Sequence, residues 1–316
     1  MYTQGVCVLV DAAPSLSVVA GALSDFRVMR ETAPSEEPQS WAFAGPSVIV
    51  DYRSDVNGVV QVDIVNQHWP DAMGEPSGAA ATIFGAWSMG HFGPCTFPGA
   101  LERGLQHAYA WPGAREVAPR HTAFLRVRSS YVFGASGSFP IQPADYDPID
   151  ELRFVSEVQL ALAGLPGFLA MFNPNGELLL PAERVEECIH RDARGEALAV
   201  DAWANVRMFR PSRDGEAWML YDTVGMGQLD VCDHQATLPR DHESTPHVPG
   251  LLYSIAEYDA QNRGVMGPDD TATDSGGCLW RAHEGGDALV VPPRRAVYWS
   301  PSNVRVPSDL RATNRE

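Results

Sequence analysis

The chain has 316 residues, 45% hydrophobic and 20% charged, and no apolar run approaches the roughly 18 residues that a membrane helix needs. All 23 basic residues are arginine, against 40 acidic residues, which gives a net charge of −17. This charge argues against nucleic acid and acidic membranes as partners, and the missing lysine excludes phosphate-loop, protein-kinase and Schiff-base chemistry.

The cysteines and the first residues favour a cytoplasmic protein. Five widely spaced cysteines form no C-x-x-C pair, which is typical of thiols in a reducing compartment. The N-terminal residues lack a basic region, and Asp11 interrupts the first apolar stretch, so we expect no cleaved signal peptide. An acid excess attracts a basic protein partner, although it also serves solubility alone.

The first hundred residues predict two strand regions, a helix and a long loop. Residues 6–10 are a buried strand, and 14–26 follow as a short helix with one apolar face. An Asn57-Gly58 turn divides 47–65 into the two strands of a hairpin. Residues 66–100 are rich in Gly, Pro and Ala, and we expect a loop there.

The middle of the chain contains the clearest local signals. Residues 121–128 alternate apolar side chains with Arg126 and Arg128, as in a strand with one buried and one solvated face. A helix begins after Asp147, which is a good N-cap, and its apolar stripe ends near Leu165. The remaining predicted elements are helices at 101–109, 181–190 and 251–262, and strands at 168–172, 200–208, 218–224 (paired with 200–208 across a turn at 213–215), 279–280 and 288–291.

We therefore predict an α+β fold with mainly antiparallel sheets and packed helices. Strand–helix–strand order, from residue 6 and again over 121–172, suggests repeated ferredoxin-like units. The polar segment 235–249 is the predicted linker between two regions. These are a main domain at 1–234 and a small C-terminal subdomain at 250–303, followed by a polar tail at 304–316.

Two motifs suggest enzyme chemistry. Zinc uses Cys and His ligands, and the candidates here are Cys232, His234, His242 and His247, although their spacing matches no standard finger. In the alternative interpretation, Cys232 fills a core and the histidines lie in a solvated loop. Ser88 stands in a near match to the G-x-S-x-G nucleophile elbow, but glycine-rich sequence replaces the strand and helix that an elbow needs. Apart from zinc, we expect no cofactor.

A second set of residues suggests binding to another protein. Trp87 and Phe92 belong to an aromatic-rich stretch that would anchor a partner if exposed and would fill a core if buried. The candidate charged contacts for a basic partner are Asp230, Asp233, Asp241, Glu243, Asp269 and Asp270.

Several stretches together carry a family resemblance, among them His-Ala-Tyr-Ala-Trp-Pro at 107–112, the strand at 202–209, Asp-Thr-Val-Gly-Met at 222–226 and the end at 297–302. Over about 101–302 the chain resembles an uncharacterised bacterial domain family found near polymorphic-toxin and secretion-system genes. The resemblance carries no catalytic signature. Together with the net charge of −17 and the absence of a catalytic motif, it favours an immunity protein that occludes a cognate toxin or effector. The alternatives are a metal-dependent or serine hydrolase, and an effector chaperone or adaptor.

Overall fold

The chain folds into two compact units, Met1–Arg194 (unit 1) and Gly195–Glu316 (unit 2). The computed structural model describes residues 1–33, 39–135, 137, 140–213 and 216–311. The predicted turn residues Asp214 and Gly215, and the end of the predicted tail, lie outside these ranges. In the described part of the chain, no helix is both long enough and apolar enough to cross a membrane.

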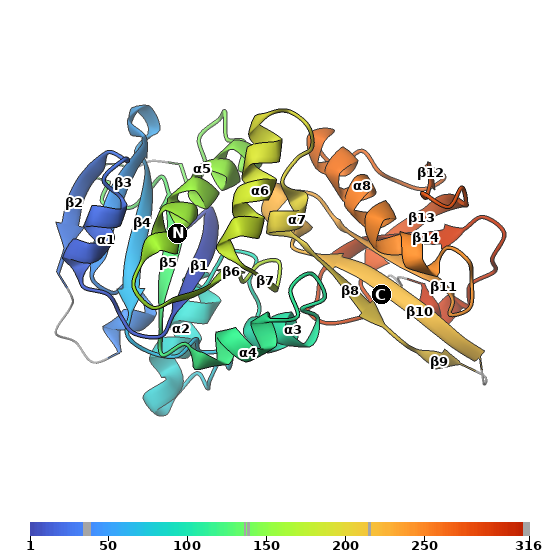
Figure 1. Ribbon diagram of the computed structural model, residues 1–316, viewed down its shortest axis with the longest axis horizontal. Coiled ribbons are helices and arrows are strands. Elements are labelled where there is room, and N and C mark those ends of the chain that lie inside the picture. The colour runs from blue at the N-terminus through green and yellow to red at the C-terminus, as the bar shows by residue number, and fades with distance from the viewer. Residues whose placement is uncertain (34–38, 136, 138–139, 214–215, 312–316) are drawn as a thin grey trace. The chain divides into compact units, whose positions relative to one another are not determined.

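Unit 1 is built on a seven-stranded sheet in the order β2-β3-β4-β5-β1-β6-β7 (Figure 1). All neighbouring strands run antiparallel. The strands are β1 (Gln4–Val10), β2 (Val28–Thr32), β3 (Ser47–Arg53), β4 (Gly58–Val65), β5 (Ala123–Ser130), β6 (Phe168–Asn173) and β7 (Leu178–Leu180). The predicted hairpin is β3–β4, and Asn57 adopts the left-handed conformation that its turn requires, with φ 61°.

Helices cover both faces of this sheet (Figure 1). They are α1 (Leu16–Ala22), α2 (Ala81–Ser88), α3 (Ala100–Gln106), α4 (Ala114–Val117), α5 (Pro148–Ala161) and α6 (Ala182–Ala193). Helix α5 packs on β1 and β5, with α6 beside it, while residues of α2, α3 and α4 pack into the core on the opposite face. Asp147 caps α5 as predicted, because its carboxylate accepts the amides of Ile149 and Asp150.

One of the two predicted strand–helix–strand units has ferredoxin-like character. Strands β5 and β6 flank β1 and are each antiparallel to it, so β5–α5–β6 is a split unit around β1. The other predicted unit, β1–α1–β2, differs because β3, β4 and β5 lie between its two strands.

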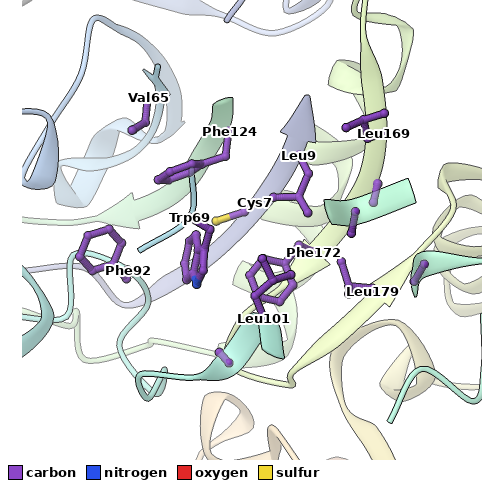
Figure 2. Packing of buried hydrophobic residues seen from close by; sticks show 14 of the residues in the cluster. Cys7, Leu9, Val65, Trp69, Phe92, Leu101, Phe124, Leu169, Phe172 and Leu179 are labelled. Atoms are coloured by element: carbon purple, nitrogen blue, oxygen red, sulfur yellow. The ribbon is translucent and has the colours of Figure 1, made fainter. Parts of the chain in front are cut away.

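The region predicted as a loop at 66–100 contains α2 and supplies a large part of the core. Trp69 lies at the centre of an aromatic cluster, with ring centroids 5.2 Å from Phe124 and 5.1 Å from Phe172 (Figure 2). The loop prediction was wrong here because glycine and alanine content describes local preference, whereas burial against the sheet decides the structure.

Unit 2 contains a second sheet in the order β12-β13-β14-β11-β10-β8, with β9 paired to β10. Only β11 and β14 run parallel; the other described pairs are antiparallel. Its elements are α7 (Val200–Trp203), β8 (Asn205–Phe209), β9 (Ser212–Arg213), β10 (Glu216–Val224), β11 (Asp233–Pro239), α8 (Val248–Gln261), β12 (Thr271–Thr273), β13 (Leu279–Asp287) and β14 (Arg295–Pro301). Helix α8 packs on β8, β10 and β11, over a core that includes Trp280 and Trp299.

The predicted α+β class with mainly antiparallel sheets is confirmed, and the domain boundary differs. Strands β8, β10 and β11 join the same sheet as β13 and β14, so the sheet begins well before the predicted linker at 235–249. The predicted strand at 200–208 begins as helix α7 and becomes a strand only at Asn205. The predicted strand at 288–291 is a loop, and β14 starts at Arg295.

Candidate functional site

Two arginines that the alternating pattern assigned to a solvated face are inside unit 1. Arg126 and Arg128 on β5 are at most 1% exposed, and both face Asp63 on β4. Arg126 Nη2 lies 2.5 Å from Asp63 Oδ2, and Arg128 Nη2 lies 2.8 Å from Oδ1. Burial alone would raise the pKa of Asp63, but the two guanidinium groups hold it below its ordinary value. The prediction of a half-buried strand was wrong because both sheet faces are covered.

The same guanidinium groups hold the segments that cover this face. Arg126 donates to the backbone carbonyls of Trp41 (2.7 Å) and Ala42 (2.8 Å), and Arg128 donates to that of His91 (3.0 Å). Burial, with Arg128 adding to it, lowers the pKa of the His91 imidazole to about 4. This buried, hydrogen-bonded arrangement around one carboxylate is a structural support.

Unit 2 contains a related cluster. Arg207 and Asp222 are fully buried with their charged atoms 2.7 Å apart, and Arg294 contacts the same carboxylate. Arg294 Nε also lies 3.1 Å from Asp233 Oδ2, and its Nη1 donates to the Val290 carbonyl. Four arginines and three aspartates of the chain are therefore used in the interiors of the two units.

The predicted aromatic contacts, Trp87 and Phe92, belong to the core. They are 6% and 1% exposed and pack against Trp69 (Figure 2 labels Phe92). The Trp87 indole donates to the Pro70 carbonyl at 3.1 Å, which satisfies its only polar atom. Neither side chain is available to anchor a partner, so this prediction was wrong.

The predicted charged contacts divide into one buried and five exposed residues. Asp233 is 4% exposed and accepts hydrogen bonds from the Thr223 hydroxyl and the Met226 amide, so it faces the interior. The other five are exposed: Asp230, Asp241, Glu243, Asp269 and Asp270.

The four predicted zinc ligands lie in different environments. Cys232 is exposed, whereas His234 is fully buried, with its Nε2 3.4 Å from Asp259 Oδ2. His242 accepts a backbone hydrogen bond within its own turn, and His247 contacts a serine hydroxyl. In the described ranges no three His, Cys, Asp or Glu side chains gather as a metal site would require.

Ser88, the candidate nucleophile, lacks the context of an elbow. It ends helix α2, and its hydroxyl donates to the Phe84 carbonyl at 2.9 Å. A 3-10 turn, Gly78–Ala80, precedes the helix where an elbow requires a strand. His91, its neighbour in sequence, turns toward the Phe43 carbonyl instead.

A different serine and histidine meet in unit 2. The Ser275 hydroxyl lies 2.9 Å from His247 Nδ1. The nearby amides of Gly276 and Cys278 are occupied, because both donate to Asp274 Oδ1. Among the described residues, no carboxylate hydrogen-bonds to the His247 ring. The pair thus lacks the orienting acid and the free amide donors of a serine hydrolase.

An open groove of about 520 Å³ lies between helix α8 and strand β12 in unit 2. One wall consists of Leu251, Ser254, Ile255 and Tyr258 on α8, and the other is β12 itself. Tyr258 and Val265 are more than half exposed there, although both are apolar in most of their surface. Asp270 lines one end. The groove has the size and mixed polarity of a ligand site.

Strand β12 is an edge strand with an unused side. The Ala282 amide donates to the Asp270 carbonyl, and the Asp274 amide donates to the Cys278 carbonyl. Because backbone groups in an antiparallel strand alternate in direction, Ala272 faces β13 while the amides and carbonyls of Thr271 and Thr273 point outward. In the part of the chain that is described, nothing bonds to these outward groups.

Both ends of β12 are held by buried or hydrogen-bonded carboxylates. Asp274 accepts the Trp280 indole at 3.0 Å, and Asp270 accepts the Gly267 amide at 2.8 Å. Asp259, inside α8, accepts the Met266 amide at 2.8 Å and so fixes the segment between helix and strand. The groove is therefore formed before any partner arrives.

Comparison with protein-family models, with curated proteins and with solved structures gave no match. The resemblance over 101–302 to a toxin-associated family therefore stays a prediction.

Proposed function

We propose that this protein is an immunity protein, which binds a basic toxin or effector and neutralises it by direct occlusion. The observation that carries the proposal is the distribution of charge. The net charge is −17, and among the described residues eight acidic side chains and three arginines are buried. An acid excess therefore remains among the more exposed residues, where it would steer a basic protein toward contact.

Further support comes from the groove in unit 2, from the cysteines and from the two candidate serines. The α8–β12 groove offers a formed concave surface beside the exposed carboxylates Asp269 and Asp270. The structure describes all five cysteines and joins none of them in a disulfide, which fits action in a reducing cytoplasm. The serine candidates favour binding over hydrolysis, since Ser88 and Ser275 both lack catalytic surroundings.

The test is co-expression of this chain with the protein encoded by the adjacent gene. We expect the two proteins to co-purify and bacterial growth to be restored relative to the neighbour alone. Equal killing with and without this chain would overturn the proposal. A complex in which the neighbour keeps its full activity would instead indicate an effector chaperone or adaptor.

A further inference from the structure

We infer that the α8–β12 groove binds an extended segment of the partner protein, which adds to β12 as a new strand. The inference rests on the proposed function for the identity of the partner, but its geometry comes from unit 2 alone. The segment is expected to direct apolar side chains into the groove and, on the same face, a cationic side chain toward Asp270.

The backbone of β12 dictates an extended occupant. Thr271 and Thr273 each direct one amide and one carbonyl outward, and these groups match the ladder of an incoming strand. A helix satisfies its own backbone groups and would leave these four unused. An edge strand with free groups and an adjacent apolar wall is a template for strand addition.

The groove wall dictates apolar side chains on one face of the segment. Successive side chains of a strand point to opposite sides, so every second residue would enter the groove. Ile255 and Leu251 provide the buried apolar surface there, and Tyr258 provides an exposed ring. Burial of one aliphatic side chain in such a site strengthens binding about tenfold or more.

The carboxylate of Asp270 at the groove favours a cationic side chain on the bound segment. The Asp270 carboxylate is exposed, and its Oδ2 accepts only a backbone amide, from Gly267. The nearby Arg281 approaches Asp269, at 3.4 Å, and no ion pair of Asp270 occurs among the described residues. Asp270 is thus a carboxylate beside the groove that is without a cationic partner, and an arginine or lysine of the segment would supply one.

The test uses the full chain and a fluorescein-labelled peptide of eight residues in which valine alternates with threonine and arginine replaces the first and last valine, so that arginine and valine share one face. We expect it to bind, and we expect a matched peptide with glutamate in place of both arginines to bind about tenfold more weakly. The same arginine peptide with N-methyl groups on the amides that face β12 should lose about fivefold or more for the hydrogen bonds removed. Bound peptide should slow hydrogen exchange at Thr271 and Thr273.

Three variants locate the site. Thr273→Pro removes an outward amide without touching the ladder to β13 and should weaken binding about fivefold. Ser254→Trp fills the groove from an exposed position on α8 and should weaken binding about tenfold. Asp270→Asn keeps the acceptor for Gly267 and should weaken binding about threefold. Glu116→Gln, an exposed charge change in unit 1, is the matched control and should bind like wild type.

The outcomes separate this inference from the proposed function. If Thr273→Pro and Ser254→Trp, both folded by thermal unfolding, bind the peptide like wild type, strand addition at β12 is wrong. If they also neutralise the adjacent-gene toxin like wild type, immunity stands without this site. If the peptide binds as expected but the wild-type chain does not neutralise the toxin, strand addition at β12 is supported and the proposed immunity role is wrong. Dimers of the wild type that Thr273→Pro abolishes would make the occupant a second copy of this chain, which overturns the inference.

Discussion

Strand β5 of unit 1 and strand β12 of unit 2 use polar residues in opposite ways. Helices and loops cover both faces of β5, so its arginines lie inside and their charges are neutralised or hydrogen-bonded there. Strand β12 has one free edge and a groove beside it, and its threonines and the neighbouring Asp270 remain exposed. A polar residue on a strand can therefore be assigned to a binding surface only once it is known whether other segments cover both faces of that strand.

The largest effect is expected from removing the carboxylate that pairs with β5. Asp63→Asn leaves Arg126 and Arg128 buried without a counter-ion, which should lower the free energy of unfolding of unit 1 by about 3–5 kcal/mol. Urea unfolding combined with hydrogen exchange of β5 and β10 amides would locate the loss in unit 1. A loss under about 1 kcal/mol, comparable to that of Glu116→Gln, would mean that the buried cluster is not a structural support.

A somewhat smaller effect is expected in the aromatic core. Trp87→Ala should lower the free energy of unfolding by about 3 kcal/mol, because it removes a buried ring that packs against Trp69 and Phe92. The exposed neighbour Met89→Ala should change it by less than about 0.5 kcal/mol. If Trp87→Ala abolished neutralisation of a partner while thermal stability stayed unchanged, Trp87 would be a contact residue after all.

His91 makes the stability of unit 1 depend on pH. Its pKa is lowered from 6.5 to about 4 by burial and then by Arg128. As the pH falls through 6.5, His91 becomes protonated in the unfolded chain but stays neutral in the folded chain. The free energy of unfolding therefore decreases until the pH reaches about 4. Relative to wild type, His91→Gln should reduce the loss between pH 7 and pH 4.5 by about 2 kcal/mol in urea unfolding. Identical pH profiles for the two proteins would contradict this assignment.

The smallest effect concerns the starts of two helices. Asp147→Ala should destabilise unit 1 by about 1 kcal/mol, because Asp147 caps α5 with two hydrogen bonds. His247 occupies the same position before α8 but makes no capping hydrogen bond, and it contacts Ser275 instead. His247→Ala should therefore change thermal stability by less than about 0.5 kcal/mol. An equal loss of thermal stability in Asp147→Ala and His247→Ala would show that the two residues contribute equally to capping their helices.

Local chemistry explains which parts of the fold were predictable from the sequence. The cap at Asp147, the turn at Asn57 and the stripe of α5 depend on residues a few positions apart, and all three occur as predicted. Helix α2 and the domain boundary were missed because they depend on which distant segments meet. No local pattern states that β11 pairs with β14.

The candidate site likewise contains residues that the sequence predicted and a groove that it did not predict. The exposed Asp269 and Asp270 were predicted, whereas the groove between α8 and β12 was not, since it arises where two separate elements approach. The buried arginines were missed although a signal existed. Gln61 and Asp63 alternate with apolar residues on one predicted strand, and Arg126 alternates with apolar residues on another. Opposite charges on two such strands favour cross-strand pairing.

The position of β1 between β5 and β6 has a consequence for how unit 1 forms during synthesis. Gln4 and its cross-strand neighbour Ser129 are 125 positions apart, so β1 leaves the ribosome before either of the strands with which it pairs. Pairings between such distant segments slow folding, and an unpaired apolar strand is open to aggregation meanwhile. Nascent chains that end before β6 should therefore stay sensitive to protease, and resistance should appear only once Asn173 has emerged.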